Sequence, residues 1–135
     1  MATKDIKELT RAEEQVMQAV WRVGQGFANE IVSAVNSTIA GGDVAYNTVL
    51  TVVRILEQKG FVGHETCNRA NHYYPLITRE EYMQQMLGRM THNWFGASPR
   101  ALVSFLVNKQ EVTLEDLEAI TKEMEKCEVK TEKIY

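Results

Sequence analysis

The sequence predicts a mainly α-helical protein with one small β-hairpin. Three observations lead to this prediction. Apolar residues recur at helical spacing before residue 60 and again after residue 78. Between these two regions, over 61–77, the pattern changes to that of two short strands. Hydrophobic residues make up 44% of the 135 residues, so an ordinary globular core can form.

The first two helices are predicted from a capping signal and from apolar spacing. In "TRAE", Thr10 and Glu13 can exchange hydrogen bonds at the start of a helix. The glycines of "GQG" at 24–26 end that helix, and a short second helix follows over about 28–36. The segment "NSTIAGG" is then expected to form a loop.

The stretch "AYNTVLTVVRILEQKG", residues 45–60, predicts a third helix, with Gly60 as its C-cap. Its apolar side consists of Val49, Val52, Val53 and Leu56. Its opposite side consists of Asn47, Thr51, Arg54 and Gln58. A polar helix face is usually only solvated, but a solvated face usually carries Glu and Lys. This face carries small hydroxyl and amide groups instead.

Two strands are predicted next, "FVGHET" at 61–66 and "HYYPLI" at 72–77. The residues "CNRAN" join them. Pro75 cannot donate to a strand ladder, so the second strand is either an edge strand or ends near this proline.

The remaining segment, 79–135, is predicted to be helical. "TREE" at 78–81 is a second capping box, and "GASP" at 96–99 interrupts the helix that it begins. Ser98 and Pro99 then begin another helix, and a last helix follows Thr113. The apolar surface of this segment is too large for so short a segment to bury alone, which predicts a homodimer. The residues expected at this dimer interface are Leu102, Phe105, Leu106, Leu114, Leu117 and Ile120.

Three helices followed by a hairpin are typical of a winged helix-turn-helix domain, so we place a DNA-binding domain at 1–78 and a helical dimerisation domain at 79–135. In a winged helix the third helix enters the major groove and the wing lies along the backbone. Asn47, Thr48 and Thr51 suit base edges, and Arg54 suits guanine or phosphate. The predicted backbone contacts come from Tyr46 on the helix and from Arg69, His64 and His72 in the hairpin.

Net charge argues mildly against nucleic-acid binding, because the chain carries −3. Residues 1–78 hold seven Lys or Arg and eight Asp or Glu. Positive charge must therefore be local, or doubled by dimerisation. Two other classes of function stay open: a winged-helix protein–protein module that has lost DNA binding, and a MarR-like regulator that responds to a small molecule.

The segments "LTRAEEQVMQAVW", "AYNTVLTVVRILEQKGFV" and "HYYPLITREEY" resemble the penicillinase-repressor family of bacterial transcription regulators, the BlaI/MecI/CopY group. The resemblance covers about residues 7–125. Its pattern in the third helix falls on Tyr46, Thr48, Val49, Thr51, Leu56, Lys59 and Gly60.

This resemblance implies a dimeric repressor of a palindromic double-stranded operator, whose C-terminal helices dimerise. It also implies, for the branch related to antibiotic resistance, a membrane metalloprotease sensor as partner and release by cleavage inside the dimerisation domain. Where that family has a scissile Asn-Phe pair, this chain has Phe105–Leu106. The copper-sensing branch has paired Cys-x-Cys motifs, whereas this chain has only Cys127 near its end, so copper sensing is not expected.

Several other functions lack support in the sequence. We find no Ser/His/Asp order, Gly-rich phosphate loop or HExxH motif, so no enzyme and no cofactor are predicted. His64, Cys67 and His72 match no common zinc spacing, so no metal is predicted. Met83, Met86 and Met90, with Tyr82, Trp94 and Phe95, suggest core or dimer surface more than a ligand pocket. No membrane span or signal peptide is expected, and the two cysteines form no disulfide framework, which together predicts a cytoplasmic protein.

Overall fold

The structure is a computed structural model that describes residues 6–38 and 42–127. It divides the chain into two compact units, Met1–Leu87 and Gly88–Tyr135. The boundary lies inside a helix that begins at Arg79, whereas the sequence predicts a domain boundary at residue 78, just before that helix.

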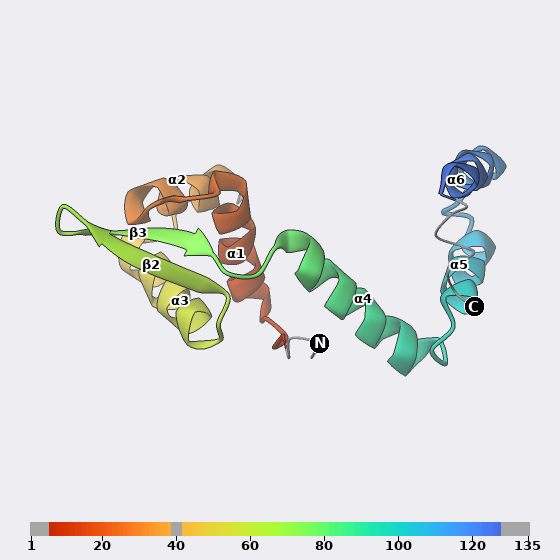
Figure 1. The fold of residues 1–135 in the computed structure, drawn as a ribbon, viewed down its shortest axis with the longest axis horizontal. Coiled ribbons are helices and arrows are strands. Elements are labelled where there is room, and N and C mark those ends of the chain that lie inside the picture. The colour runs from red at the N-terminus through yellow and green to blue at the C-terminus, as the bar shows by residue number, and fades with distance from the viewer. Residues whose placement is uncertain (1–5, 39–41, 128–135) are drawn as a thin grey trace. The chain divides into compact units, whose positions relative to one another are not determined.

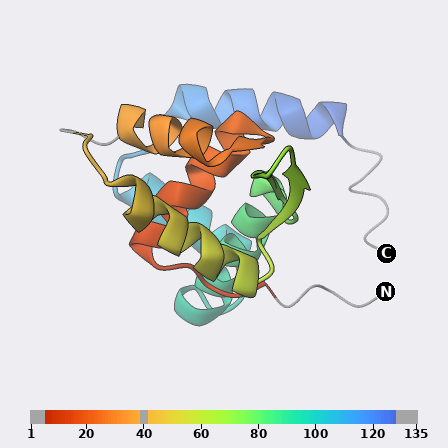
Figure 2. The same ribbon diagram turned by 90° about the vertical axis from the view of Figure 1, so that its left-hand side faces the viewer.

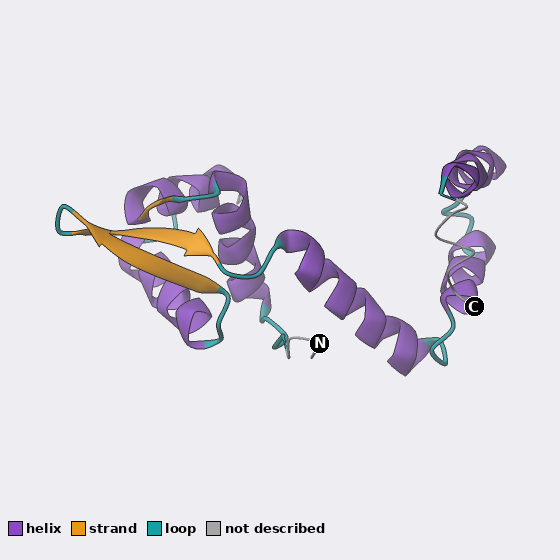
Figure 3. Ribbon diagram, viewed as in Figure 1, coloured by secondary structure: helices purple, strands orange, loops and turns teal. Residues whose placement is uncertain are grey.

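The fold is mainly α-helical with one small sheet, as the sequence predicts (Figures 1 and 3). The elements in chain order are α1 Arg11–Val23, β1 Gly26–Phe27, α2 Ala28–Thr38, α3 Tyr46–Gln58, β2 Val62–Cys67, β3 Ala70–Pro75, α4 Arg79–Trp94, α5 Pro99–Asn108 and α6 Leu114–Lys126.

The sheet has three strands rather than the two predicted, in the order β1-β3-β2. The extra strand, β1, pairs Gly26 with Tyr73 and Phe27 with His72. Two residues are too few to show an alternating pattern, so the sequence gives no signal for this strand. Because β1 lies beside it, β3 is the central strand, and the prediction that it is an edge strand was wrong. Its alternative was correct, because β3 ends at Pro75.

The core lies in the first unit, where α1, α2 and α3 gather beside the sheet (Figures 1 and 2). Each of the three helices turns its apolar stripe toward this core. The buried hydrophobic residues are Ile6, Leu9, Val16, Met17, Ala19, Val20, Ile31, Val35, Val49, Val53, Leu56, Phe61, Val62, Tyr73, Ile77 and Tyr82.

Both predicted capping boxes are present. Glu13 N donates to Thr10 Oγ1 at 3.3 Å, and Thr10 N donates to Glu13 Oε1 at 3.0 Å. At the start of α4, Glu81 N and Thr78 Oγ1 are 3.0 Å apart, and Thr78 N donates back to Glu81 Oε1 at 2.8 Å. These reciprocal bonds fix where α1 and α4 begin.

Tertiary hydrogen bonds attach the beginning of α4 to the first unit. The Tyr82 hydroxyl donates to Glu14 Oε2 at 3.0 Å and accepts from Leu9 N at 3.3 Å. Trp21 Nε1 donates to the carbonyl of Ile77 at 2.8 Å. Burial raises the pKa of the Tyr82 hydroxyl, and the Glu14 carboxylate raises it further. The first turn of α4 is therefore an integral part of the winged-helix unit.

In the second unit, described over 88–127, no residue is buried. The predicted caps are present, since Ser98 Oγ accepts from Ala101 N at 3.1 Å and Thr113 begins α6. Of the methionines and aromatics expected in the core or at a dimer surface, only Tyr82 is buried in the single chain, so the dimer surface stays a prediction for the others. The exposed members are Met83, Met86, Met90 and, with 80% of its surface exposed, Trp94.

Within the described residues, no helix is long and apolar enough to span a bilayer.

Candidate nucleic-acid interface

Helix α3 separates its residues by face, as the helical wheel predicts. Val49, Val53 and Leu56 are almost fully buried against the core. The exposed residues of the opposite face are Tyr46, Asn47, Thr48, Thr51, Arg54 and Gln58. The sequence therefore places on one exposed helix face all the α3 residues that it predicts to contact DNA.

The polar groups of this face are open to an external partner. The Thr51 hydroxyl donates to the Asn47 carbonyl at 2.9 Å, which leaves its oxygen free to accept. In the part of the chain that the structure describes, the Asn47 amide and the Arg54 guanidinium have no hydrogen-bond partner of their own chain. An amide both donates and accepts, while a guanidinium presents five donors in a planar fork. This combination can pair with the edges of bases and with phosphates.

An ion pair fixes the C-terminal end of α3 against α1. Lys59 Nζ lies 2.6 Å from Glu13 Oε1, and it also donates to the Glu8 carbonyl at 3.4 Å. Burial alone would raise the pKa of Glu13, but the hydrogen bonds from Lys59 and Thr10 and the Lys59 charge outweigh it. The net pKa of Glu13 therefore lies below its ordinary value. The family pattern in the third helix includes Lys59, but the sequence does not show that Glu13 is its partner.

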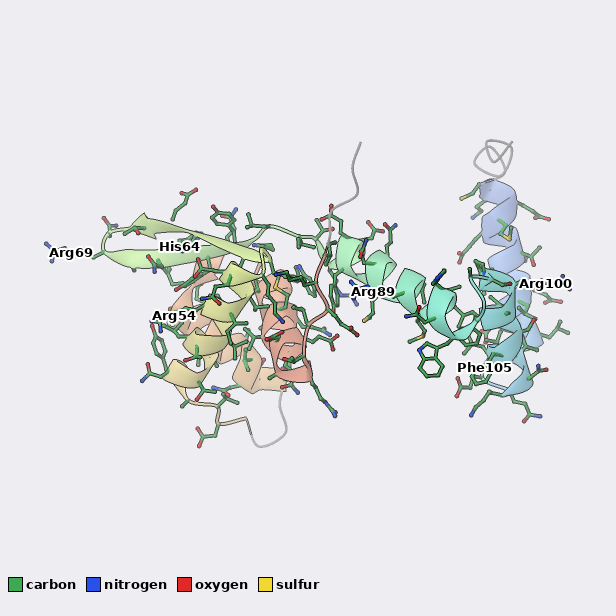
Figure 4. All side chains as sticks on the ribbon, turned by 90° about the horizontal axis from the view of Figure 1, so that it is seen from below. Arg54, His64, Arg69, Arg89, Arg100 and Phe105 are labelled. Carbon is green, nitrogen blue, oxygen red and sulfur yellow. The ribbon has the colours of Figure 1, made fainter. Side chains whose placement is uncertain are left out.

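The hairpin ends in a tight turn at Asn68 and Arg69, whose φ angles are 53° and 69°. Two successive positive φ angles are typical of a type I′ turn, which suits the twist of a hairpin. Arg69 is exposed at the tip, as Figure 4 shows, and Arg54 is exposed on α3. Both arginines thus remain available to a polyanion.

The two predicted histidines of the hairpin lie on opposite faces of the sheet. His64 pairs with the buried Tyr73 in the strand register, and its Nδ1 contacts the Glu57 carboxylate of α3. His72 pairs with Glu65 and packs edge-on against the Phe27 ring, with ring centroids 4.9 Å apart. Side chains of paired residues point to the same face. The structure therefore brings His64 to α3 and places His72 on the other side.

This alternation also places His64 on the face opposite Cys67 and His72. Among the described residues, no group of three or more His, Cys, Asp or Glu side chains is arranged to hold a metal ion. Cys67 is exposed and free beside the hairpin turn.

Three helices, a small sheet with a hairpin wing and an exposed polar third helix define the winged-helix class. The chain matches the penicillinase repressor family over residues 9–126. It therefore belongs to this family, whose members are DNA-binding repressors and not enzymes.

The chain is also similar to individual proteins. The methicillin resistance regulatory protein MecI of Staphylococcus aureus is 22% identical over 113 residues, which are 84% of this chain and 89% of the relative. The penicillinase repressor of Bacillus licheniformis is 24% identical over 108 residues, which are 79% of this chain and 82% of the relative. The solution structure of the DNA-binding domain of the repressor BlaI is 26% identical, with a TM-score of 0.49, and covers 59% of this chain and 94% of that domain.

Proposed function

We propose that this chain is a homodimeric, sequence-specific DNA-binding repressor of transcription. The observation that supports this proposal best is the exposed polar face of α3 on a winged-helix unit. Asn47, Thr48 and Thr51 present amide, hydroxyl and methyl groups, and a recognition helix in the major groove uses such groups to read base edges. Membership in the penicillinase repressor family supports repression as the outcome of binding.

Affinity for the DNA backbone comes from a small number of cationic and hydroxyl groups. Arg54 and Tyr46 flank the reading residues on α3, and Arg69 is exposed at the wing tip. Phosphate contacts position a protein on the duplex, whereas base contacts specify the sequence. With a net charge of −3 per chain, affinity for the duplex depends on the placement of these few groups.

Dimerisation is the second part of the proposal. Residues 88–127 contain no buried side chain, although α5 and α6 are well capped and carry apolar stripes. A second copy of the chain would cover these stripes and double the DNA contacts, so a palindromic operator is expected. The proposed interface includes Leu102, Phe105, Leu106, Leu114, Leu117 and Ile120.

Proteolytic relief is the third part. The Phe105–Leu106 bond lies in the last turns of α5, and the Phe105 ring packs against Phe95 at a centroid distance of 5.6 Å. Figure 4 shows Phe105 on this helix. Cutting α5 here would divide the proposed interface and release the operator. The protease that we propose is a membrane metalloprotease sensor, as the resemblance of the sequence to the penicillinase-repressor family implies.

The test begins with DNA fragments that the purified protein selects from its source genome. Binding to the selected duplex is measured by gel shift across a salt series, with unrelated duplex as competitor. A repressor binds this duplex tightly against competitor and loses affinity steeply as salt rises, because phosphate contacts release counterions. A protein–protein module selects no duplex, and that result would overturn the proposal. Operator release by a small molecule, with the chain intact, would instead indicate a MarR-like regulator.

A further inference from the structure

The side-chain amide of Asn36 forms two hydrogen bonds with one peptide unit of the segment that leads into α3. Val44 N donates to Asn36 Oδ1 at 2.7 Å, and Asn36 Nδ2 donates to the Val44 carbonyl at 3.3 Å. Both residues are partly buried, and Val44 also packs against the core. The amide thus joins the last turn of α2 to the chain just before α3 through a pair of hydrogen bonds, one donated and one accepted.

In the described residues, no side-chain cap fixes the beginning of α3. Its N-cap residue is Ala45, which provides no side-chain hydrogen bond to the first turn. Gly42, two residues before Val44, restricts the backbone less than any other residue type does. Val44 stands only two residues before Tyr46 and three before Asn47. A shift at Val44 therefore moves the residues proposed to read bases.

We propose that Asn36 is a positioning residue for base recognition, which it performs through Val44 without contacting DNA. This inference rests on the proposed function, since it concerns how α3 is presented to the major groove. Base contacts depend on position and angle, whereas phosphate contacts of long cationic side chains tolerate small shifts. Loss of the Asn36 amide should therefore lower specific affinity more than non-specific affinity.

Asn36→Ala should change the stability of the fold only slightly. Position 36 lies inside α2, where alanine favours the helix more than asparagine does. The two hydrogen bonds that Asn36→Ala removes each add only modestly to the stability of the fold. The two effects of Asn36→Ala partly cancel, so the variant should keep its fold and remain suitable for binding measurements.

The experiment compares wild type with Asn36→Ala, Asn36→Asp and the control Ser37→Ala. Ser37 lies in the same turn of α2, but its hydroxyl donates only to Ala34 of the same helix. Asn36→Asp keeps an acceptor for Val44 N and loses the donor to the Val44 carbonyl. The full-length proteins are titrated with the duplex that wild type selects and with unrelated duplex, over a salt series.

We expect Asn36→Ala to weaken operator binding about tenfold, the effect of one lost base contact. The affinity for unrelated duplex should stay within about twofold of wild type, because phosphate contacts persist. The slope of log affinity against log salt concentration should also stay within about twofold of wild type. The operator affinity of Asn36→Asp should lie between those of wild type and Asn36→Ala. The operator affinity of Ser37→Ala should match that of wild type. Equal operator affinity of Asn36→Ala and Ser37→Ala would overturn the inference, as would an equal loss on both duplexes.

A second measurement needs no DNA. The Val49 amide makes the first backbone hydrogen bond of α3, to the Ala45 carbonyl at 3.1 Å, whereas the side-chain hydrogen bonds of Asn36 go to Val44. Its hydrogen exchange should be faster in Asn36→Ala than in Ser37→Ala if the amide fixes the helix start, and unchanged exchange would contradict the inference. If wild type selects no duplex but the Val49 amide responds, the positioning role stands and the proposed function fails.

Discussion

Gly60 and Gln110 occupy the same position of the same motif at the ends of two different helices. At the end of α3, Gly60 N donates to the Glu57 carbonyl at 3.1 Å and Phe61 N to Leu56 at 2.9 Å. At the end of α5, Gln110 N donates to Val107 at 2.9 Å and the next amide to Leu106 at 3.1 Å. Both are Schellman motifs, with φ of 86° at Gly60 and 63° at Gln110.

The shared motif predicts opposite effects of two substitutions. A Cβ at Gly60 would have nothing within 4 Å, so Gly60→Ala should destabilise the protein only through its positive φ, by about 1 kcal/mol. Gln110→Gly removes the same strain and should stabilise by a similar or smaller amount. Urea unfolding followed by circular dichroism, at one protein concentration, measures both. If Gly60→Ala is as stable as wild type, then the positive φ at the end of α3 does not affect the free energy of unfolding.

The Glu13–Lys59 pair predicts how stability depends on pH. The pKa of Glu13 is lowered in the folded protein, so its ionised form stabilises the fold above the ordinary glutamate value of about 4.3. That contribution is lost as the pH falls through the lower, folded pKa. Glu13→Gln keeps the acceptor for Thr10 N but removes the charge beside Lys59. We expect this variant to be about 1–3 kcal/mol less stable at pH 7, with a flatter acid-unfolding profile between pH 5 and 3.

The control for this prediction is Glu118→Gln, which changes the same side chain at an exposed site on α6. Its acid-unfolding profile should follow wild type. A Glu13→Gln protein with an unchanged profile would mean that the pair with Lys59 contributes nothing to the stability of the fold.

The features that follow from local sequence were predicted well. Capping at Thr10 and Thr78, the buried stripe of α3 and the hairpin after Gly60 each depend on residues close together in the chain. Hydrogen-bonded caps and amphipathic spacing are local properties, so one sequence is enough to detect them. The same reasoning placed the polar residues of α3 on one exposed face.

The features that depend on distant partners could not be predicted. The Asn36 amide and the Lys59 ammonium give no local sign that Val44 and Glu13 are their partners. The strand β1 escaped notice because its pairing with β3 joins residues more than forty positions apart. The sequence names His64 and His72 together as contacts from the wing, but it does not show which face of the hairpin meets α3. Pairing and burial are properties of the assembled unit.

The reading face gives a direct mutational prediction. Thr51→Ala and Arg54→Ala should each weaken operator binding by about 1–3 kcal/mol if these side chains contact bases. Arg79→Ala removes an exposed positive charge at the start of α4 and serves as the matched control. Isothermal titration with the selected duplex measures all three. Normal binding by both α3 variants, with the fold intact, would exclude α3 as the reading helix.

The wing predicts a different pattern for its two candidate residues. Arg69→Ala should weaken binding to every duplex about equally and lower the salt slope by about 1, as loss of one phosphate contact does. His72→Ala should leave the slope unchanged, because its ring packs against Phe27 on the sheet face away from α3. Salt titrations of both variants on unrelated duplex give the slopes. A lower slope for His72→Ala would show that DNA reaches this second face.

Because none of the described residues of the second unit is buried, we expect dimerisation and operator binding to depend on the same residues of this unit. Leu106 is half-buried on α5 of the single chain, and its neighbourhood lacks a core. A carboxylate there would have to be buried in the proposed interface without a partner, so Leu106→Asp should dissociate the dimer. Sedimentation should then show a monomer at concentrations where wild type is dimeric.

The control, Ser104→Asp, places the same carboxylate at an exposed position of α5 and should remain dimeric. Operator binding adds a second consequence, because a monomer contacts one half-site at a time. Leu106→Asp should therefore bind a single half-site as wild type does, but lose the gain in affinity that the full palindrome gives. A dimeric Leu106→Asp would place the interface on another face of the second unit, whereas a monomer that binds the palindrome normally would separate dimerisation from recognition.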